Sequence, residues 1–159
     1  MNGEGDAGMT VIVTHEPEAT EAAGERLGRR LAPGDAVLLI GELAAGKTTL
    51  VRGLAAGVGA DPAEVDSPTF VLVQTYPCRP DAPVRRLHHV DLYRIRRPGE
   101  LDTIGLEELL SETDAVCAIE WPRDLLTHRL PPATPVWAVR LEALPGGVRR
   151  ITITPPPER

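Results

Sequence analysis

The sequence has little cysteine, no long apolar run and no excess of positive charge, and each absence narrows the class of protein. Its two cysteines, Cys78 and Cys117, fit neither a Cys-x-x-Cys pair nor a metal-ligand spacing, so we expect neither a disulfide framework nor a zinc site. No stretch approaches the roughly 18 apolar residues of a membrane-spanning helix. Glu4 and Asp6 precede the first apolar run, unlike the start of a secretory signal. We therefore expect a soluble cytoplasmic protein with no membrane partner.

The charge balance is acidic rather than basic. Lysine and arginine together number 17 against 23 aspartates and glutamates, which gives a formal net charge of −6. A domain that binds nucleic acid on its own needs a basic surface to neutralise phosphates. We therefore expect any link to RNA to run through a partner. The 159 residues, 42% of them apolar, suffice for one globular domain with a packed core.

The order of apolar runs predicts an α/β fold with a mixed parallel and antiparallel sheet flanked by helices. We expect this domain to span residues 10–154, between a flexible N-terminal tail at 1–9 and a flexible Pro-rich tail at 155–159. Apolar and β-branched runs predict strands at 10–14, 36–40, 70–76, 84–93, 115–119, 136–141 and 148–153. We expect 70–76 to form a hairpin with 84–93, and 136–141 to form one with 148–153.

Helical periodicity predicts one helix that begins at Pro17 and two that span 47–58 and 106–110, with a loop at 61–68. The stripe of the first helix that we expect to be buried consists of Ala19, Ala23, Leu27 and Leu31.

A glycine-rich loop joins the strand 36–40 to the helix 47–58 in the pattern Gly-x-x-x-x-Gly-Lys-Thr. Its residues are Gly41, Glu42, Leu43, Ala44, Ala45, Gly46, Lys47 and Thr48, and Thr49 follows. Glycines allow backbone angles that aim successive N–H groups at one anion, and the following helix adds the positive end of its dipole. In such a P-loop, Lys47 reaches the β- and γ-phosphates and Thr48 offers its hydroxyl to magnesium. A glycine-rich turn with a solvated lysine is the alternative, but the flanking strand and helix favour a P-loop NTPase-like domain.

Phosphoryl transfer also needs carboxylates that hold the metal, directly or through water, and orient the attacking group. Glu120 ends the buried run 115–119 and Asp91 follows a strand, so we expect both at the carboxyl edge of the sheet, where α/β folds bind ligands. The candidate catalytic residues are Lys47, Asp91 and Glu120, and the candidate magnesium ligands are Thr48, Asp91 and Glu120. The spacing leaves open which carboxylate binds the metal. We expect Glu120 as the ligand and Asp91 as the water-orienting or outer-shell residue.

Three neighbouring features each have more than one interpretation. His88 and His89 are adjacent, so a strand directs them to opposite faces and they cannot chelate one metal together; packing or surface roles are expected. The basic run 94–97 is either a partner patch or a solvated segment. Trp121 either packs in the core or lines the site.

Four segments in order resemble the TsaE (YjeE) family, the P-loop ATPases of bacterial tRNA threonylcarbamoyladenosine synthesis. They are the loop 41–48 with Thr49, Ser67-Pro68-Thr69-Phe70, His89-Val90-Asp91-Leu92-Tyr93-Arg94 and Glu120-Trp121-Pro122. The family has this combination with similar gaps, and the resemblance extends from about residue 11 to about residue 153. It implies that ATP and Mg²⁺ are the cofactors. It also implies that two segments act as switch regions near the γ-phosphate, one with Ser67 and Thr69 and the other spanning residues 89–94. Trp121 would be an aromatic neighbour of the magnesium-linked Glu120.

The resemblance further implies an ATPase that is weak alone and acts with two partners. These are a TsaD-like threonylcarbamoyl transferase, which modifies adenosine 37 of tRNA (t6A37), and a TsaB-like subunit. ATP hydrolysis would reset the complex for another turnover, with tRNA contacted mainly by the partners. One departure is Ala44, which stands where the family often has glycine. Its backbone must avoid the left-handed region or tolerate some strain.

Two other functions fit the same loop. A small P-loop kinase, acting on a nucleotide or small molecule, would need an acceptor pocket and a lid with arginines; Arg123 and Arg129 are candidates, although no lid insertion is evident. A nucleotide-gated adapter would bind a partner with negligible turnover. A GTPase is disfavoured because the only asparagine is Asn2, so the Asn-Lys-x-Asp segment of guanine sites is missing.

Overall fold

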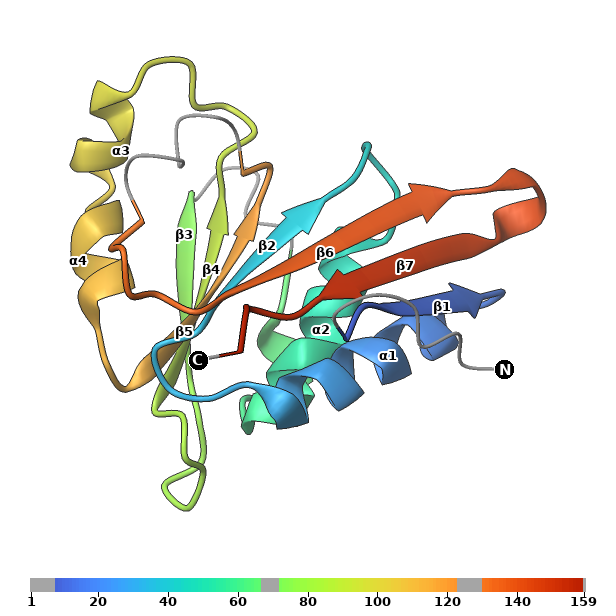
Figure 1. Ribbon diagram of the computed structural model, residues 1–159, viewed down its shortest axis with the longest axis horizontal. Helices are drawn as coiled ribbons and strands as arrows, with labels where there is room; N and C mark the ends of the chain where they lie inside the picture. The colour runs from blue at the N-terminus through green and yellow to red at the C-terminus, as the bar shows by residue number, and fades with distance from the viewer. Residues whose placement is uncertain (1–7, 67–71, 123–129, 159) are drawn as a thin grey trace.

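The computed structural model describes residues 8–66, 72–122 and 130–158, which form a seven-stranded sheet with helices (Figure 1). The strands are β1 (Thr10–Thr14), β2 (Ala36–Ile40), β3 (Val73–Pro77), β4 (Arg86–Asp91), β5 (Ala115–Glu120), β6 (Val136–Ala143) and β7 (Arg149–Thr154). Their order across the sheet is β1-β7-β6-β2-β5-β4-β3. β2 is parallel to β5 and β6, and β4 to β5, whereas the pairs β1 with β7, β6 with β7 and β3 with β4 are antiparallel. The mixed sheet confirms the predicted α/β fold.

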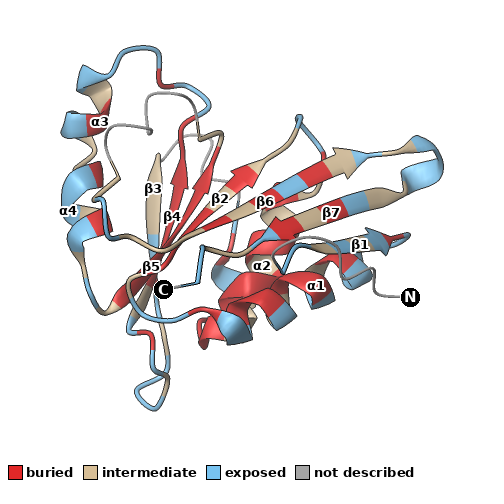
Figure 2. Ribbon diagram, viewed as in Figure 1, coloured by how far each residue is buried: buried red, intermediate tan, exposed pale blue. Residues whose placement is uncertain are grey.

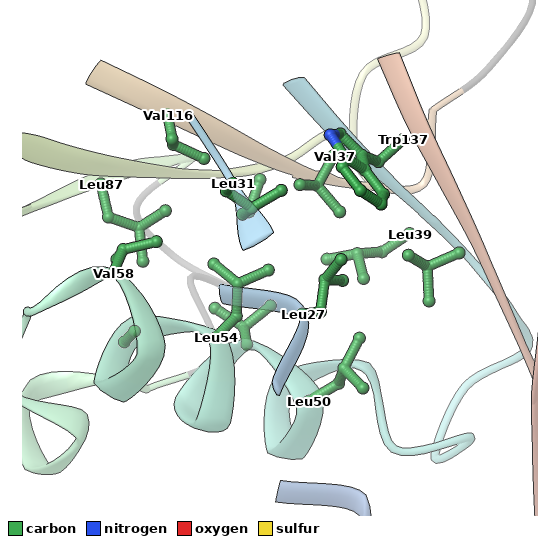
Figure 3. Close-up of a cluster of buried hydrophobic side chains, with 14 of the residues drawn as sticks. Leu27, Leu31, Val37, Leu39, Leu50, Leu54, Val58, Leu87, Val116 and Trp137 are labelled. Atoms are coloured by element: carbon green, nitrogen blue, oxygen red, sulfur yellow. The ribbon is translucent and has the colours of Figure 1, made fainter. Parts of the chain in front are cut away.

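The helices pack against the two faces of this sheet. They are α1 (Pro17–Arg30), α2 (Lys47–Val58), α3 (Gly99–Thr103) and α4 (Leu106–Ser111). Side chains alternate along a strand, so Val116 and Ala118 of β5 join the core with α1 and α2, while Cys117 and Ile119 join the core with α3 and α4. β5 is buried along its whole length, and β4 at every residue but its first (Figure 2). In Figure 3, Leu50 and Leu54 of α2 point toward the sheet.

Glycines bring α1 and α2 into close contact. A β-carbon at Gly53 of α2 would lie 1.8 Å from the carbonyl oxygen of Glu21, and one at Gly24 of α1 would lie 2.2 Å from that of Leu50. The predicted stripe of α1 is wrong at Ala19, which is exposed. The other three predicted residues, Ala23, Leu27 and Leu31, are buried, and Thr20, Gly24 and Gly28 are buried beside them. Apolar periodicity did not indicate the two glycines because glycine contributes no apolar side chain.

Several element boundaries differ from the predictions, although α2 begins and ends where the sequence indicates. β4 ends at Asp91 rather than continuing to residue 93, because the Asp91 side chain accepts the backbone N–H of Tyr93 at 2.9 Å and turns the chain. β3 begins at residue 73 rather than 70, although residues 70 and 71 lie outside the described part of the chain. Helix α3 was not predicted. The segment 61–68, predicted as a loop, contains the short 3-10 helix η1 (Pro62–Glu64).

The C-terminal hairpin is longer than predicted. β6 continues to residue 143, two residues beyond the apolar run, and the 3-10 turn η3 (Pro145–Gly147) joins it to β7. Within the described residues, no helix has the length and apolar character needed to cross a membrane.

Candidate functional site

Three neighbouring strands place the sequence-predicted residues at one edge of the sheet. β2 leads directly into the glycine-rich loop, β4 ends at Asp91 and β5 ends at Glu120. Glu120 of β5 lies between two register partners. These are Asp91 in the parallel strand β4 and Leu39 in the parallel strand β2. The loop and both carboxylates therefore meet at the carboxyl ends of parallel strands, where α/β folds bind ligands.

These residues surround a cavity of about 400 Å³. The predicted site residues that line it are Leu43, Ala44, Gly46, Lys47, Thr48, Thr49, Asp91, Glu120 and Trp121. Among the described residues, Gly41, Glu42 and Ala45 belong to the loop without lining the cavity. Ser67, Thr69 and the kinase-lid candidates Arg123 and Arg129 lie outside the described residues.

The backbone of the loop departs from right-handed geometry at two positions. Gly46, which precedes α2, has φ of 101°, and Ala44 has φ of 62°. Alanine at a left-handed position is disfavoured by about 1 kcal/mol or more because its β-carbon crowds the following carbonyl. The Ala44 carbonyl oxygen accepts a hydrogen bond of 3.2 Å from Nη2 of Arg149 on β7. Of the two alternatives for Ala44, the structure therefore has the left-handed backbone, and the hydrogen bond from Arg149 of β7 constrains the loop in this conformation.

Lys47 is directed into the loop and is only 5% exposed. Its Nζ donates to the carbonyl oxygen of Gly41 and, at 3.2 Å, to that of Glu42, and it lies 3.7 Å from the centroid of the Trp121 ring. Burial lowers the pKa of Lys47 below its ordinary value, and the nearby Glu120, Asp91 and Glu42 carboxylates oppose that shift. The Lys47 ammonium group is thus held near the carboxylates of Asp91 and Glu120.

Trp121 lines the cavity rather than packing in the core, which decides between its two interpretations. Its φ is 57°, which is unusual for a bulky residue and is found most often at functional sites. The ring lies 5.0 Å from that of Tyr93, centroid to centroid, so the two aromatics flank the lysine side of the cavity.

Asp91 and Glu120 are both buried at the base of the cavity. Burial raises the pKa of Asp91 and the neighbouring negative charge of Glu120 raises it further, while the Tyr93 N–H, His89 and Lys47 act in the opposite direction. Two buried carboxylates side by side favour a bound cation. Among the described residues, no group of three or more histidine, cysteine, aspartate or glutamate side chains is arranged to hold a metal ion. Proteins usually bind Mg²⁺ through one or two carboxylates together with substrate phosphates, and Asp91 and Glu120 offer two carboxylates at this cavity.

Reasoning from residue types missed His89 as part of this site, although the family resemblance placed the segment 89–94 near the γ-phosphate. The prediction that His88 and His89 face opposite sides of the sheet is confirmed, but neither lies on the surface. Nε2 of His89 is 2.6 Å from Oε2 of Glu120, whereas Nε2 of His88 is 2.7 Å from Oε2 of Glu112, which follows α4. The alternation of a strand places His89 on the same face as Asp91, and this was the available signal.

Further residues complete the cavity. Tyr93 and Arg94 follow β4 and belong to the segment 89–94 that carries the family resemblance. The remaining residues come from the start of α1, from the residue before β3 and from the region where β7 begins, and they had no local signal: Glu16, Pro17, Thr20, Leu72, Gly147 and Arg149. Of the basic run 94–97, Arg94 therefore lies at the cavity.

Comparison with known proteins identifies one family. The sequence profile of the family described as threonylcarbamoyl adenosine biosynthesis protein TsaE matches residues 14–150. The TsaE protein of Treponema pallidum is 38% identical over 141 residues, which span 89% of this chain and 97% of that protein. The TsaE protein of Streptomyces coelicolor is 48% identical over 99 residues, 62% of this chain and 64% of the relative. Among solved structures, Bacillus subtilis YdiB is similar with a TM-score of 0.67 and 27% identity, over 98% of this chain and 87% of that one. The matched region includes the loop and both carboxylates.

Proposed function

The chain belongs to the TsaE family, and from this premise we propose that it binds and hydrolyses ATP with Mg²⁺ to support threonylcarbamoyl transfer to tRNA. The observation that carries the proposal is the convergence of Lys47, Thr48, Asp91 and Glu120 on one cavity at the carboxyl edge of the sheet. Relatives named for tRNA threonylcarbamoyladenosine biosynthesis support the cellular role.

Each residue has a distinct task in this proposal. The loop 41–48 holds the phosphates through its backbone N–H groups and the start of α2. Lys47 pairs with the β- and γ-phosphate oxygens, for which its buried cation is already oriented beside the loop. Trp121 and Tyr93 shield this side of the cavity from water. Ser67 and Thr69 are proposed to act near the γ-phosphate, as the family resemblance implies.

The carboxylates and Thr48 divide the metal and water chemistry. The Thr48 hydroxyl and the Glu120 carboxylate would hold Mg²⁺, directly or through water, with Asp91 as a second or outer-shell contact. Bound Mg²⁺ neutralises the charge that builds up on the phosphate oxygens. Asp91 accepts a hydrogen bond from the attacking water and orients it toward the γ-phosphate. This role suits a carboxylate that is buried at the cavity beside Glu120.

The partners in this proposal are a TsaD-like threonylcarbamoyl transferase and a TsaB-like subunit. The net charge of −6 supports an arrangement in which tRNA is bound by these partners and reached by this chain only indirectly. Hydrolysis would then reset the transferase complex for its next turnover.

Phosphate release with and without the two partners tests this proposal. We expect slow release of phosphate by the chain alone, faster release with both partners and tRNA, and no phosphorylated product besides inorganic phosphate. A phosphorylated small molecule would instead indicate the kinase alternative. Binding of ATP without turnover in the complete mixture would indicate the adapter, and turnover unchanged by the partners would contradict the role in tRNA modification.

A further inference from the structure

His89 is a buried polar residue of the site to which the P-loop pattern assigns no task. It is fully buried, and its Nε2 lies 2.6 Å from Oε2 of Glu120. An ionised carboxylate can only accept hydrogen bonds, so Nε2 carries the proton of this bond. Hydrogen bonds to a charged acceptor are shorter and stronger than neutral ones. One of the two oxygens of Glu120 is therefore held by the sheet itself.

The register of the sheet produces this contact. In the parallel pair β4 and β5, Asp91 lies opposite Glu120 and His89 lies opposite Ala118. Residues two apart on a strand share a face, so His89 is on the face of both carboxylates, one step further from the edge. His89 thus reaches Glu120 diagonally from beneath the cavity, while His88 points to the opposite face and binds Glu112.

Tyr76 of β3 holds the other side of the imidazole. Its hydroxyl oxygen is 3.4 Å from Nδ1 of His89, and the two ring centroids are 6.2 Å apart. Tyr76 is itself buried, and its hydroxyl donates to Oε1 of Gln74. Nε2 of His89 therefore faces Glu120 and Nδ1 faces the Tyr76 oxygen, so rotation of the ring would separate both pairs.

We propose that His89 is a positioning residue that holds Oε2 of Glu120 and leaves Oε1 as the oxygen presented to the cavity. The proposal rests on the proposed function, since it assigns His89 to the magnesium–nucleotide site. Carboxylates that bind metals are commonly oriented by hydrogen bonds from residues that do not touch the metal, and loss of such a partner lowers metal affinity by about 10- to 100-fold. His89 acts on the metal only through Glu120.

Two substitutions of His89 separate positioning from packing, and His88 offers a matched control. In His89→Gln the side-chain amide extends to the position of Nε2, whereas in His89→Asn it stops near the position of Nδ1, away from Glu120. His88→Asn alters a histidine of the same strand that is also buried but faces away from the site. The measurement is the Kd for ATP of each variant, with Mg²⁺ and with the metal removed by EDTA.

We expect His89→Asn to weaken ATP binding about tenfold in Mg²⁺ and to leave the affinity in EDTA unchanged. His89→Gln should stay within about threefold of the unaltered chain in both conditions, as should His88→Asn. An unchanged Kd of His89→Asn in Mg²⁺, or an equal loss with and without Mg²⁺, overturns the inference. If the unaltered chain bound no ATP, the proposed function would fail and this inference with it. A failure of the inference alone is distinguishable, because the unaltered chain would then still bind ATP.

Tyr76→Phe provides a second test should His89→Asn fail to fold. It retains the ring but removes the hydroxyl that faces Nδ1, so the imidazole loses one of its two supports. We expect a loss of about threefold in ATP affinity that appears only with Mg²⁺. An affinity equal to that of the unaltered chain in Mg²⁺ would overturn the positioning role.

Discussion

At the scale of single residues, Ala44 shows strain inside the loop that holds the phosphates. Its φ of 62° is one of two left-handed values among the described non-glycine residues, and the other belongs to Trp121 at the same cavity. Strained backbone persists where the surrounding structure determines it, and Arg149 provides that constraint through the Ala44 carbonyl.

Replacement of Ala44 by glycine should relieve this strain. Removing the β-carbon gains about 1–2 kcal/mol at a left-handed position, and the greater freedom of unfolded glycine offsets about 0.5–1 kcal/mol of it. We expect Ala44→Gly to raise the free energy of unfolding by up to about 1.5 kcal/mol, as measured in urea. Ala45→Gly is the control, because Ala45 is buried and its φ is not positive, and it should lower stability. Equal losses in both variants would contradict strain at Ala44.

Because the pKa of Asp91 is raised in the folded protein, we expect its ionised side chain to lower the free energy of unfolding at neutral pH. Between the ordinary value of 3.8 and the raised pKa, the folded protein binds more protons than the unfolded chain. The free energy of unfolding therefore falls as pH rises through that interval. Asp91→Asn removes the charge and retains Oδ1 for the Tyr93 amide. We expect it to be more stable than the unaltered chain at neutral pH, and this advantage should shrink as pH falls toward 3.8.

Urea unfolding at several pH values checks the Asp91 prediction. The matched control is Asp61→Asn, because Asp61 is exposed and its Oδ1 likewise accepts the amide two residues later, at 2.9 Å. That variant should match the unaltered chain at neutral pH. An Asp91→Asn variant that is no more stable than the unaltered chain at neutral pH would contradict the account of Asp91.

At the scale of elements, the contact of α1 with α2 determines where the P-loop helix lies. Four glycines let the two helix backbones approach each other: Gly24, Gly28, Gly53 and Gly57. Because α2 begins at Lys47, a displacement of this helix would move the lysine and the Thr48 hydroxyl relative to the carboxylates of β4 and β5.

Gly53→Ala should therefore damage both stability and nucleotide binding. The added methyl group would lie 1.8 Å from the Glu21 carbonyl oxygen, a backbone atom that cannot move aside alone. Overpacking of this kind lowers stability by about 1–3 kcal/mol or more, beyond the small gain in helix propensity. Gly99→Ala in α3 is the control, because its β-carbon would meet no atom within 4 Å. Chemical denaturation of both variants measures the difference, and equal stability would contradict the close helix contact.

Elements with local signals were predictable from the sequence, and those that depend on distant contacts were not. The bounds of α2 follow from the loop before it and the glycine after it, and β5 follows from an uninterrupted apolar run. For α1 the predicted stripe was wrong only at Ala19. The buried glycines Gly24 and Gly28 were not predicted, because their contacts with the backbone of α2 leave no apolar pattern. α3 is short and its apolar residues are few, so helical periodicity could not develop over its five residues.

At the scale of the whole molecule, the cavity connects segments that are far apart in the sequence. The loop was recognisable from its Gly-x-x-x-x-Gly-Lys-Thr pattern, and the two carboxylates were recognisable because each comes at the end of a strand. The contact between Arg149 and Ala44 spans 105 residues and depends on the order of strands across the sheet, which no local pattern specifies. His89 is intermediate, since its face was predictable but its contact with Glu120 required the register of β4 with β5.

A ligand that binds this cavity should stabilise the entire fold. ATP with Mg²⁺ would contact the loop after β2, the start of α2 and the ends of β4 and β5. A ligand at a hundred times its Kd stabilises a protein by about 2.7 kcal/mol. We expect a clear rise in unfolding temperature with ATP and Mg²⁺. AMP lacks the β- and γ-phosphates that the loop and Lys47 would hold, so its effect at the same concentration should be much smaller. Equal shifts with ATP and AMP would contradict phosphate recognition by the loop.

The most direct test of the central claim is the affinity of Lys47→Ala for ATP with Mg²⁺, measured by titration calorimetry beside the unaltered chain. Lys47 is the only lysine in the sequence, so no neighbouring lysine can replace it. If the cavity is a magnesium–nucleotide site, the unaltered chain binds ATP and Lys47→Ala loses at least about tenfold in affinity, since charge-assisted contacts to phosphate contribute about 1.5–3 kcal/mol. Undiminished affinity in Lys47→Ala, with the fold intact, would contradict the claim.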